Sequence, residues 1–111
     1  VCALSAGLFE GSAVTRYARR GHIPGSLNIP ARGLFDEHGR YLQPQALRTV
    51  LEPLLQTTAP VVVYCGGGIS AAAQALALTL VGRANVLLYD GSLQEWAADS
   101  RLPLTTGAAP A

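Results

Sequence analysis

The hydrophobic positions of the chain fall into short apolar runs separated by amphipathic segments. Val61 to Tyr64 is a continuous, β-branched run that follows a proline, and such a run is typical of a strand buried on both faces of a parallel sheet. Asn85 to Tyr89 has the same character and ends in a turn dipeptide. Val1 to Ser5 and Ser26 to Ile29 are shorter, and the second is closed by a proline. The pattern therefore predicts four strands.

Segments with helical spacing alternate with these strands. A helix is expected to begin at Pro44, because proline is favoured at the first helical position. Its apolar face is formed by Leu47, Val50, Leu51 and Leu54. Pro53 should end or kink this helix near Glu52. A second helix is expected from Ser70, a natural N-cap, through an alanine-rich segment that stops at Gly82.

The remaining segments complete the fold prediction. Ser92 and Glu95 form a capping-box pattern that predicts a short last helix, and residues 6–21 are predicted to be a loop or a short helix. Strands that alternate with helices indicate an α/β fold with a mainly parallel sheet flanked by helices on both faces. We expect one domain over residues 1–104, followed by a C-terminal tail over residues 105–111.

Composition narrows the class of protein. With 111 residues, half of them hydrophobic, the chain is long enough for one core and too short for two ordinary domains. Charged residues make up 14% and the formal net charge is +1, which argues against a disordered segment and against an electrostatic nucleic-acid binder. All eight basic residues are arginines, so a Schiff-base lysine and the lysine of a phosphate-binding loop are excluded.

The two cysteines and two histidines show no spacing typical of a zinc or iron-sulfur site, and a disulfide framework is not expected. No apolar run approaches the roughly 20 residues that span a bilayer, and the first residues lack the plan of a secretory signal. We therefore expect a cytoplasmic domain without a membrane partner. Cys2 lies inside the first predicted strand and is expected to be a small, inert, buried side chain.

The candidate chemistry lies in the segment Cys65-Gly66-Gly67-Gly68-Ile69-Ser70, between a predicted strand and a predicted helix. Such a turn lies at the carboxyl end of the sheet, where α/β proteins bind ligands. Glycine-rich backbone and the positive end of a helix both stabilise a thiolate. If a second sulfur is added to Cys65, the same amides can hold the persulfide anion. Ser70 has two interpretations, as the helix cap or as a direct substrate contact.

This loop does not stand alone. It follows Gly21-His22-Ile23-Pro24-Gly25-Ser26-Leu27-Asn28-Ile29-Pro30 and precedes Tyr89-Asp90-Gly91-Ser92-Leu93-Gln94-Glu95-Trp96. Together the three motifs resemble the rhodanese family, and most of all the catalytic second domain of tandem thiosulfate or 3-mercaptopyruvate sulfurtransferases.

The resemblance implies a three-layer rhodanese-like fold and a sulfurtransferase activity that needs no metal or organic cofactor. It implies that Cys65 carries the persulfide and that Gly66, Gly67, Gly68, Ile69 and Ser70 bind the substrate. The donor would be thiosulfate or 3-mercaptopyruvate, the acceptor cyanide or a cellular thiol, and a second rhodanese domain could belong to the parent chain. His22, Asp90 and Trp96 are interpreted as structural: a buried turn histidine, a turn brace and a core side chain.

One departure from the family pattern concerns charge. Family members usually close the first strand with Asp-x-Arg, whose arginine helps to bind an anionic donor, whereas this strand ends Ala3-Leu4-Ser5-Ala6. Arg16, Arg19 or Arg20 could supply the missing positive charge, and Arg20 is included among the expected substrate-binding residues. The small neutral loop resembles that of mercaptopyruvate-using members.

Two other functions remain as alternatives. A related class of phosphatase resembles rhodanese but uses a Cys-x-x-x-x-x-Arg loop whose arginine clamps a phosphate, and here that position is Ala71. A non-catalytic rhodanese-like binding or regulatory module is favoured by the missing Asp-x-Arg string. It is disfavoured by Cys65, since inactive modules commonly lack the cysteine.

Overall fold

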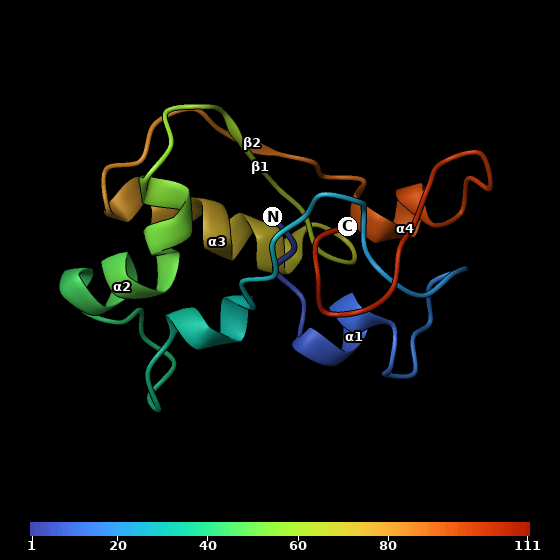
Figure 1. Ribbon diagram of the computed structural model, residues 1–111. Coiled ribbons are helices and arrows are strands. Elements are labelled where there is room, and N and C mark those ends of the chain that lie inside the picture. Colours follow the sequence, from blue (N-terminus) through green and yellow to red (C-terminus); the bar gives the residue numbers. More distant parts are fainter.

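The computed structural model describes residues 1–111 and is built around parallel strand pairing (Figure 1). β1 (Val61–Val63) pairs with β2 (Val86–Leu88) in parallel, with Val61 opposite Val86. Cys2 forms parallel bridges to Asn28 on one side and to Tyr64 on the other. The order across the sheet is therefore Asn28, Cys2, β1, β2. The first two predicted strands are confirmed in position, but each is reduced to a single bridging residue, Cys2 or Asn28.

Five helical segments connect and cover the strands. They are α1 (Ala6–Glu10), the 3-10 helix η1 (Ala31–Leu34), α2 (Pro44–Leu55), α3 (Ile69–Leu80) and α4 (Ser92–Trp96). The prediction that this helix ends near Glu52 is wrong, since α2 continues through Pro53 to Leu55, and the alternative of a kink stays a prediction. Leu54 is buried on the same face as Leu47 and Leu51, and this burial outweighs the one hydrogen bond that proline cannot donate.

The core has two parts, one on each face of the sheet. The larger part joins α2, α3 and η1 to the face formed by Val61, Val63 and Cys65. The smaller part lies on the opposite face and consists of Cys2, Phe9, Tyr64 and Leu93. Because Phe9 belongs to α1 and Leu93 to α4, both faces receive helices, and the α/β fold class is confirmed.

The second face is covered only in part. Val62 is 45% exposed and Leu87 is 55% exposed, so the expectation that Val61 to Tyr64 is buried on both faces is wrong for its second residue. The physical reason is that α1 and α4 are only five residues long and pack near Tyr64 rather than along the whole strand. None of the helices combines the length and hydropathy needed to cross a bilayer.

The last residues fold back onto the body of the domain. Thr105 forms an antiparallel bridge with His22, and the Gly107 amide donates to the Glu10 carbonyl. The His22 ring is fully buried and stacks on Phe9 with 3.6 Å between ring centroids. Its two nitrogens lie 2.8 Å from the Phe9 carbonyl and 3.1 Å from the Pro110 carbonyl, which supports the structural role expected for this histidine. The division at residue 104 stays a prediction.

Candidate functional site

The site is the turn that leads from β1 into α3. Cys65 lies just beyond the end of β1 and is 2% exposed. Its Sγ accepts a hydrogen bond from the Gly68 amide at a distance of 3.0 Å. Gly68 has φ 98°, a left-handed conformation that favours glycine, and this conformation turns its amide back toward the sulfur. The turn therefore holds a sulfur atom against the backbone at the start of a helix.

Further amides of this turn make no hydrogen bond within the chain. The N-H groups of Gly66, Gly67, Ile69 and Ser70 donate to no acceptor of the chain. The first N-H groups of a helix have no partner within the helix, and consecutive free amides form a concave site for an anion. Gly67 is exposed and Ile69 is 86% exposed, so the turn faces solvent on this side. The arrangement suits a negatively charged sulfur that is extended by one more atom.

The structure excludes one of the two interpretations of Ser70, the helix cap, and the substrate contact stays a prediction. Gly68 occupies the N-cap position of α3, and no side chain caps the helix. Ser70 is the second residue of α3, and its hydroxyl makes no hydrogen bond within the chain. The predicted N-cap role is wrong because the left-handed Gly68 starts the helix two residues earlier. The Ser70 hydroxyl is thus available to a ligand.

The segment that begins α4 braces the turn from the other side. The fully buried Ser92 hydroxyl accepts a hydrogen bond from the Cys65 amide at 3.1 Å and donates to the Tyr89 carbonyl at 2.9 Å. The Leu93 amide donates to the Cys65 carbonyl, and the Gln94 amide donates to the Gly66 carbonyl. The predicted capping box is wrong, since Ser92 holds the cysteine instead of capping its own helix. Ser92 has φ 52°, an uncommon conformation for a residue other than glycine.

Two side chains lie directly against the glycines. A Cβ at Gly66 would overlap the Tyr17 hydroxyl, and a Cβ at Gly68 would lie 2.8 Å from Asp90 Oδ1 and 3.1 Å from the Asp90 carbonyl oxygen. The Asp90 side chain contacts Gly68 but makes no hydrogen bond. The prediction that Asp90 braces a turn through such a bond is therefore wrong. The close approach of neighbouring atoms is a reason for glycine at both positions.

The prediction that Trp96 is a core side chain is wrong. Trp96 is half-buried, and its indole N-H donates to the Pro103 carbonyl at 2.7 Å. The ring lies at the edge of a groove on the partly covered face of the sheet, with an edge-on contact to Tyr89. An indole needs a partner for its N-H, and the C-terminal segment supplies one at the surface.

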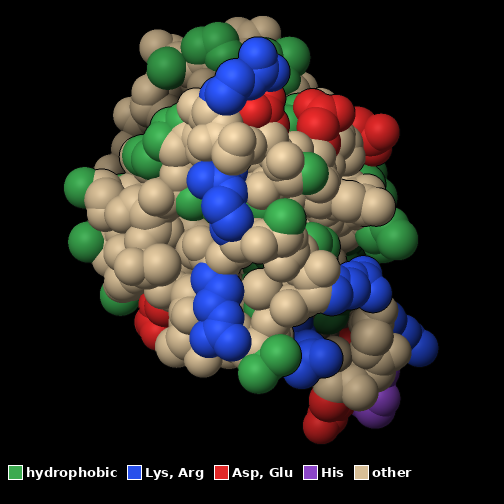
Figure 2. All heavy atoms as spheres, turned by 90° about the vertical axis from the view of Figure 1, so that its right-hand side faces the viewer, with side chains coloured by type: hydrophobic (Ala, Val, Ile, Leu, Met, Phe, Trp, Pro, Cys, Tyr) green, Lys and Arg blue, Asp and Glu red, His purple; other side chains and the backbone are tan.

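Arginine is missing from the end of the first strand, where family members have Asp-x-Arg. The three arginines that could replace it have different surroundings. Arg19 is occupied, because its guanidinium donates to the carbonyls of Trp96, Ala97, Asp99 and Leu102 at 2.8 to 3.3 Å. Arg16 is exposed and lies 5.9 Å from the centre of the Tyr17 ring. Arg20 is exposed, and its side chain makes no hydrogen bond within the chain. Figure 2 shows basic side chains distributed along one face of the molecule.

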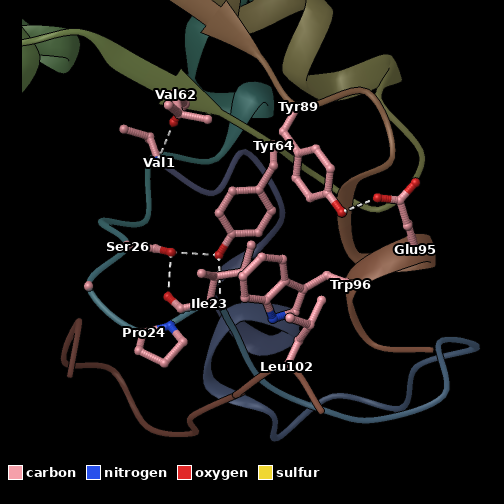
Figure 3. A pocket seen from close by; sticks show the side chains of 11 residues that line it. Val1, Ile23, Pro24, Ser26, Val62, Tyr64, Tyr89, Glu95, Trp96 and Leu102 are labelled. Atoms are coloured by element: carbon pink, nitrogen blue, oxygen red, sulfur yellow. Dashed lines mark hydrogen bonds between the residues drawn. The ribbon is translucent and has the colours of Figure 1, made fainter. Parts of the chain in front are cut away.

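Two cavities bear on the assignment of the site. The larger, of about 590 Å³, lies on the partly covered face of the sheet, where Tyr64, Tyr89 and Trp96 line it (Figure 3). Cys65 is not among its lining residues. A smaller cavity of about 420 Å³ is lined by Ser70 of the turn and by Arg32 of η1. Cys65 does not line the smaller cavity either, but Ser70 of the cysteine turn does, so the smaller cavity is the candidate ligand site of the two.

The second cysteine has a different setting. Cys2 is fully buried in the smaller core cluster, and burial raises the pKa of its thiol. The prediction that Cys2 is buried is confirmed, and its inertness stays a prediction that the raised pKa supports. Neither cysteine forms a disulfide.

Sequence reasoning missed three residues of this site. Ser92 was interpreted only as a cap, and nothing in the order of residues indicated Tyr17 beside Gly66. Arg32 had a usable signal, since it follows the strand closed by Pro30 and strand ends of a parallel sheet share one edge.

Comparisons with known proteins agree on one family. The family model described as a rhodanese-like domain matches residues 6–99. The chain is 38% identical over 86 residues to the 3-mercaptopyruvate sulfurtransferase of Escherichia coli (strain K12), a match that covers 78% of this chain and 31% of that protein. It is also 38% identical over 85 residues to thiosulfate/3-mercaptopyruvate sulfurtransferase 2 of Arabidopsis thaliana, covering 76% of this chain and 25% of that protein.

Solved structures give the same result. The Tum1 protein of Saccharomyces cerevisiae superposes with a TM-score of 0.81 at 33% identity, over 96% of this chain and 38% of that one. An anaerobic ergothioneine biosynthesis enzyme of Chlorobium limicola has a TM-score of 0.86 at 20% identity, over 97% of this chain and 28% of that one, and shows the fold alone. The chain thus spans between a quarter and two fifths of the length of these proteins.

Proposed function

Because this chain belongs to the rhodanese family, we propose that it is a sulfurtransferase domain in which Cys65 accepts and passes on one sulfur atom as a persulfide. The observation that carries the proposal is the hydrogen bond from the Gly68 amide to Cys65 Sγ, within a turn whose other amides are free. The Gly68 amide already donates to the sulfur that would carry negative charge before and after transfer.

The proposed reaction has two steps, the loading of Cys65 with sulfur and the transfer of that sulfur to an acceptor. In the first, the Cys65 thiolate attacks the outer sulfur of thiosulfate, a sulfur-sulfur bond forms, and sulfite leaves with the electron pair of the broken bond. With 3-mercaptopyruvate the carbon-sulfur bond breaks instead, and the thiol proton ends on the carbon of the pyruvate that leaves. In the second step an acceptor such as cyanide attacks the outer sulfur and forms a carbon-sulfur bond. The sulfur-sulfur bond of the persulfide breaks, its electron pair restores the Cys65 thiolate, and thiocyanate leaves.

The free amides of Gly66, Gly67, Ile69 and Ser70 are the proposed binding groups for the outer sulfur and the donor. We propose that Arg20 attracts the anionic donor by long-range electrostatics, since its guanidinium is exposed and unpaired. 3-Mercaptopyruvate is favoured as a donor by the absence of charged side chains from the turn and by the name of the Escherichia coli relative.

Mass spectrometry of the intact protein tests this function. After incubation with thiosulfate or 3-mercaptopyruvate, the protein should gain the mass of one sulfur, and cyanide should remove it. Cys65→Ser should abolish the gain, whereas the matched variant Cys2→Ser should keep it, because Cys2 lies in the core and not in the turn. No gain from either donor, or a gain that survives Cys65→Ser, refutes the proposal and favours the binding-module alternative.

A further inference from the structure

The cavity of about 420 Å³ opens where two parallel segments of the sheet end. Leu4 follows the segment that contains Cys2, and Pro30 and Arg32 follow the segment that contains Asn28. Ser70 belongs to the cysteine turn and completes the lining on the third side. The cavity is therefore at the carboxyl edge of the sheet, where it meets the last residue of the turn that carries Cys65.

The lining combines apolar walls with one positive charge. Leu4, Leu8 and Pro30 supply apolar surface, and Arg32 is the only charged residue of the lining. Arg32 is exposed, and its guanidinium takes part in no hydrogen bond or salt bridge. The hydroxyls of Ser5 and Ser70 are the other polar side-chain groups of the lining, and neither makes a hydrogen bond within the chain. The lining contains no carboxylate that would neutralise the positive charge of Arg32 and oppose the binding of an anion.

We propose that this cavity selects the sulfur donor: Arg32 pairs with the anionic group of the donor, and Leu4 and Leu8 contact an apolar body. This inference rests on the proposed function of Cys65. The favoured class is a monoanionic organic donor, to which 3-mercaptopyruvate also belongs. Within this class an aryl thiosulfonate has the apolar body that thiosulfate, a small dianion, lacks. In the transfer step the Cys65 thiolate bonds to the outer sulfur, the sulfur-sulfur bond of the donor breaks, and an aryl sulfinate leaves with the electron pair.

Binding is tested first, without any sulfur transfer. Benzenesulfonate has the ring and the anionic head but no sulfur to give, and calorimetric titration measures its affinity for the protein. Arg32→Gln should weaken binding about tenfold, the size expected for loss of one charge-assisted hydrogen bond at a solvent-accessible rim. Arg48→Gln is the matched control, because Arg48 is an equally unpaired, exposed arginine on α2. It should bind benzenesulfonate like the unmodified protein.

Transfer is tested second, as kcat/KM for benzenethiosulfonate and for thiosulfate with cyanide as acceptor. Arg32→Gln should lower kcat/KM for benzenethiosulfonate about tenfold, mainly through KM, with Arg48→Gln unchanged. Leu4→Arg, which exchanges apolar wall for a second cation, should shift the ratio of the two donors toward thiosulfate. Circular dichroism identifies a variant that fails to fold. If Leu4→Arg does so, the surface substitution Arg32→Gln still decides the result.

The two proposals fail in different ways. Equal affinity and equal kcat/KM in Arg32→Gln and Arg48→Gln overturn the role of Arg32 and leave the sulfurtransferase function intact. Benzenesulfonate binding that depends on Arg32, with no sulfur transferred to Cys65 from any donor, overturns the proposed function and supports the cavity as an anion site.

Discussion

Substitution of Gly68 by alanine probes the contact on which the proposed chemistry depends. Gly68 has φ 98°, and its amide donates to Cys65 Sγ at 3.0 Å. The added Cβ would lie 2.8 Å from Asp90 Oδ1 and 3.1 Å from the Asp90 carbonyl oxygen, which belongs to backbone and moves less easily than a side chain. Alanine is therefore opposed both by the backbone conformation and by the space available.

The expected cost follows from these two terms. A left-handed conformation costs a residue with a Cβ about 1–2 kcal/mol, and crowding in a packed region adds about 1–3 kcal/mol. We expect Gly68→Ala to lower the free energy of unfolding by about 2–5 kcal/mol. Relief of the contacts requires the turn to move by several tenths of an ångström, and a displacement approaching 1 Å costs about 100-fold in rate. Persulfide formation should fall at least tenfold.

Gly82→Ala separates the cost of the left-handed backbone conformation from the cost of crowding. Gly82 has φ 84°, but no atom lies within 4 Å of the position that its Cβ would occupy. This control should lose only about 1–2 kcal/mol and keep its transfer rate. Urea unfolding and the initial rate of persulfide formation, measured by mass, are the two assays. If Gly68→Ala is no less stable than Gly82→Ala and transfers sulfur at the original rate, the geometry of this turn does not hold the reacting sulfur.

Two further predictions concern stability. Arg19→Met should lower the free energy of unfolding by about 2 kcal/mol, because several carbonyls around α4 lose a charged donor, whereas Arg48→Met should change it little in the same urea assay. A smaller loss in Arg19→Met than in Arg48→Met would contradict this role. Burial raises the pKa of Tyr64 above its ordinary value of 10.0, so the stability this phenol confers is complete below pH 10.0 and is lost as pH rises through the higher folded-state pKa. Urea unfolding above pH 10.0 should therefore show a steeper loss in the unmodified protein than in Tyr64→Phe, and equal slopes would exclude this assignment.

Local sequence determined much of the architecture. The alanine-rich segment that ends at Gly82 forms α3, since its helical propensity and its C-terminal glycine act within one segment. The apolar runs beginning at Val61 and near Val86 form β1 and β2 in parallel. The position of Cys65 between a strand and a helix also followed from sequence order, because a strand-to-helix turn needs no information from distant residues.

What the sequence could not determine depends on residues that are distant along the chain. Ser92 reaches the Cys65 amide from 27 positions away, and Arg32 shares a cavity with Ser70 only because two strands end at the same edge. The exposure of Val62 and the half-burial of Trp96 depend on where short helices pack, which apolar patterning does not specify. Sequence thus determined which segment carries the thiol, because backbone conformation is set locally. Tertiary structure decided which side chains surround it, because packing brings together segments whose order in the chain does not encode their distance in space.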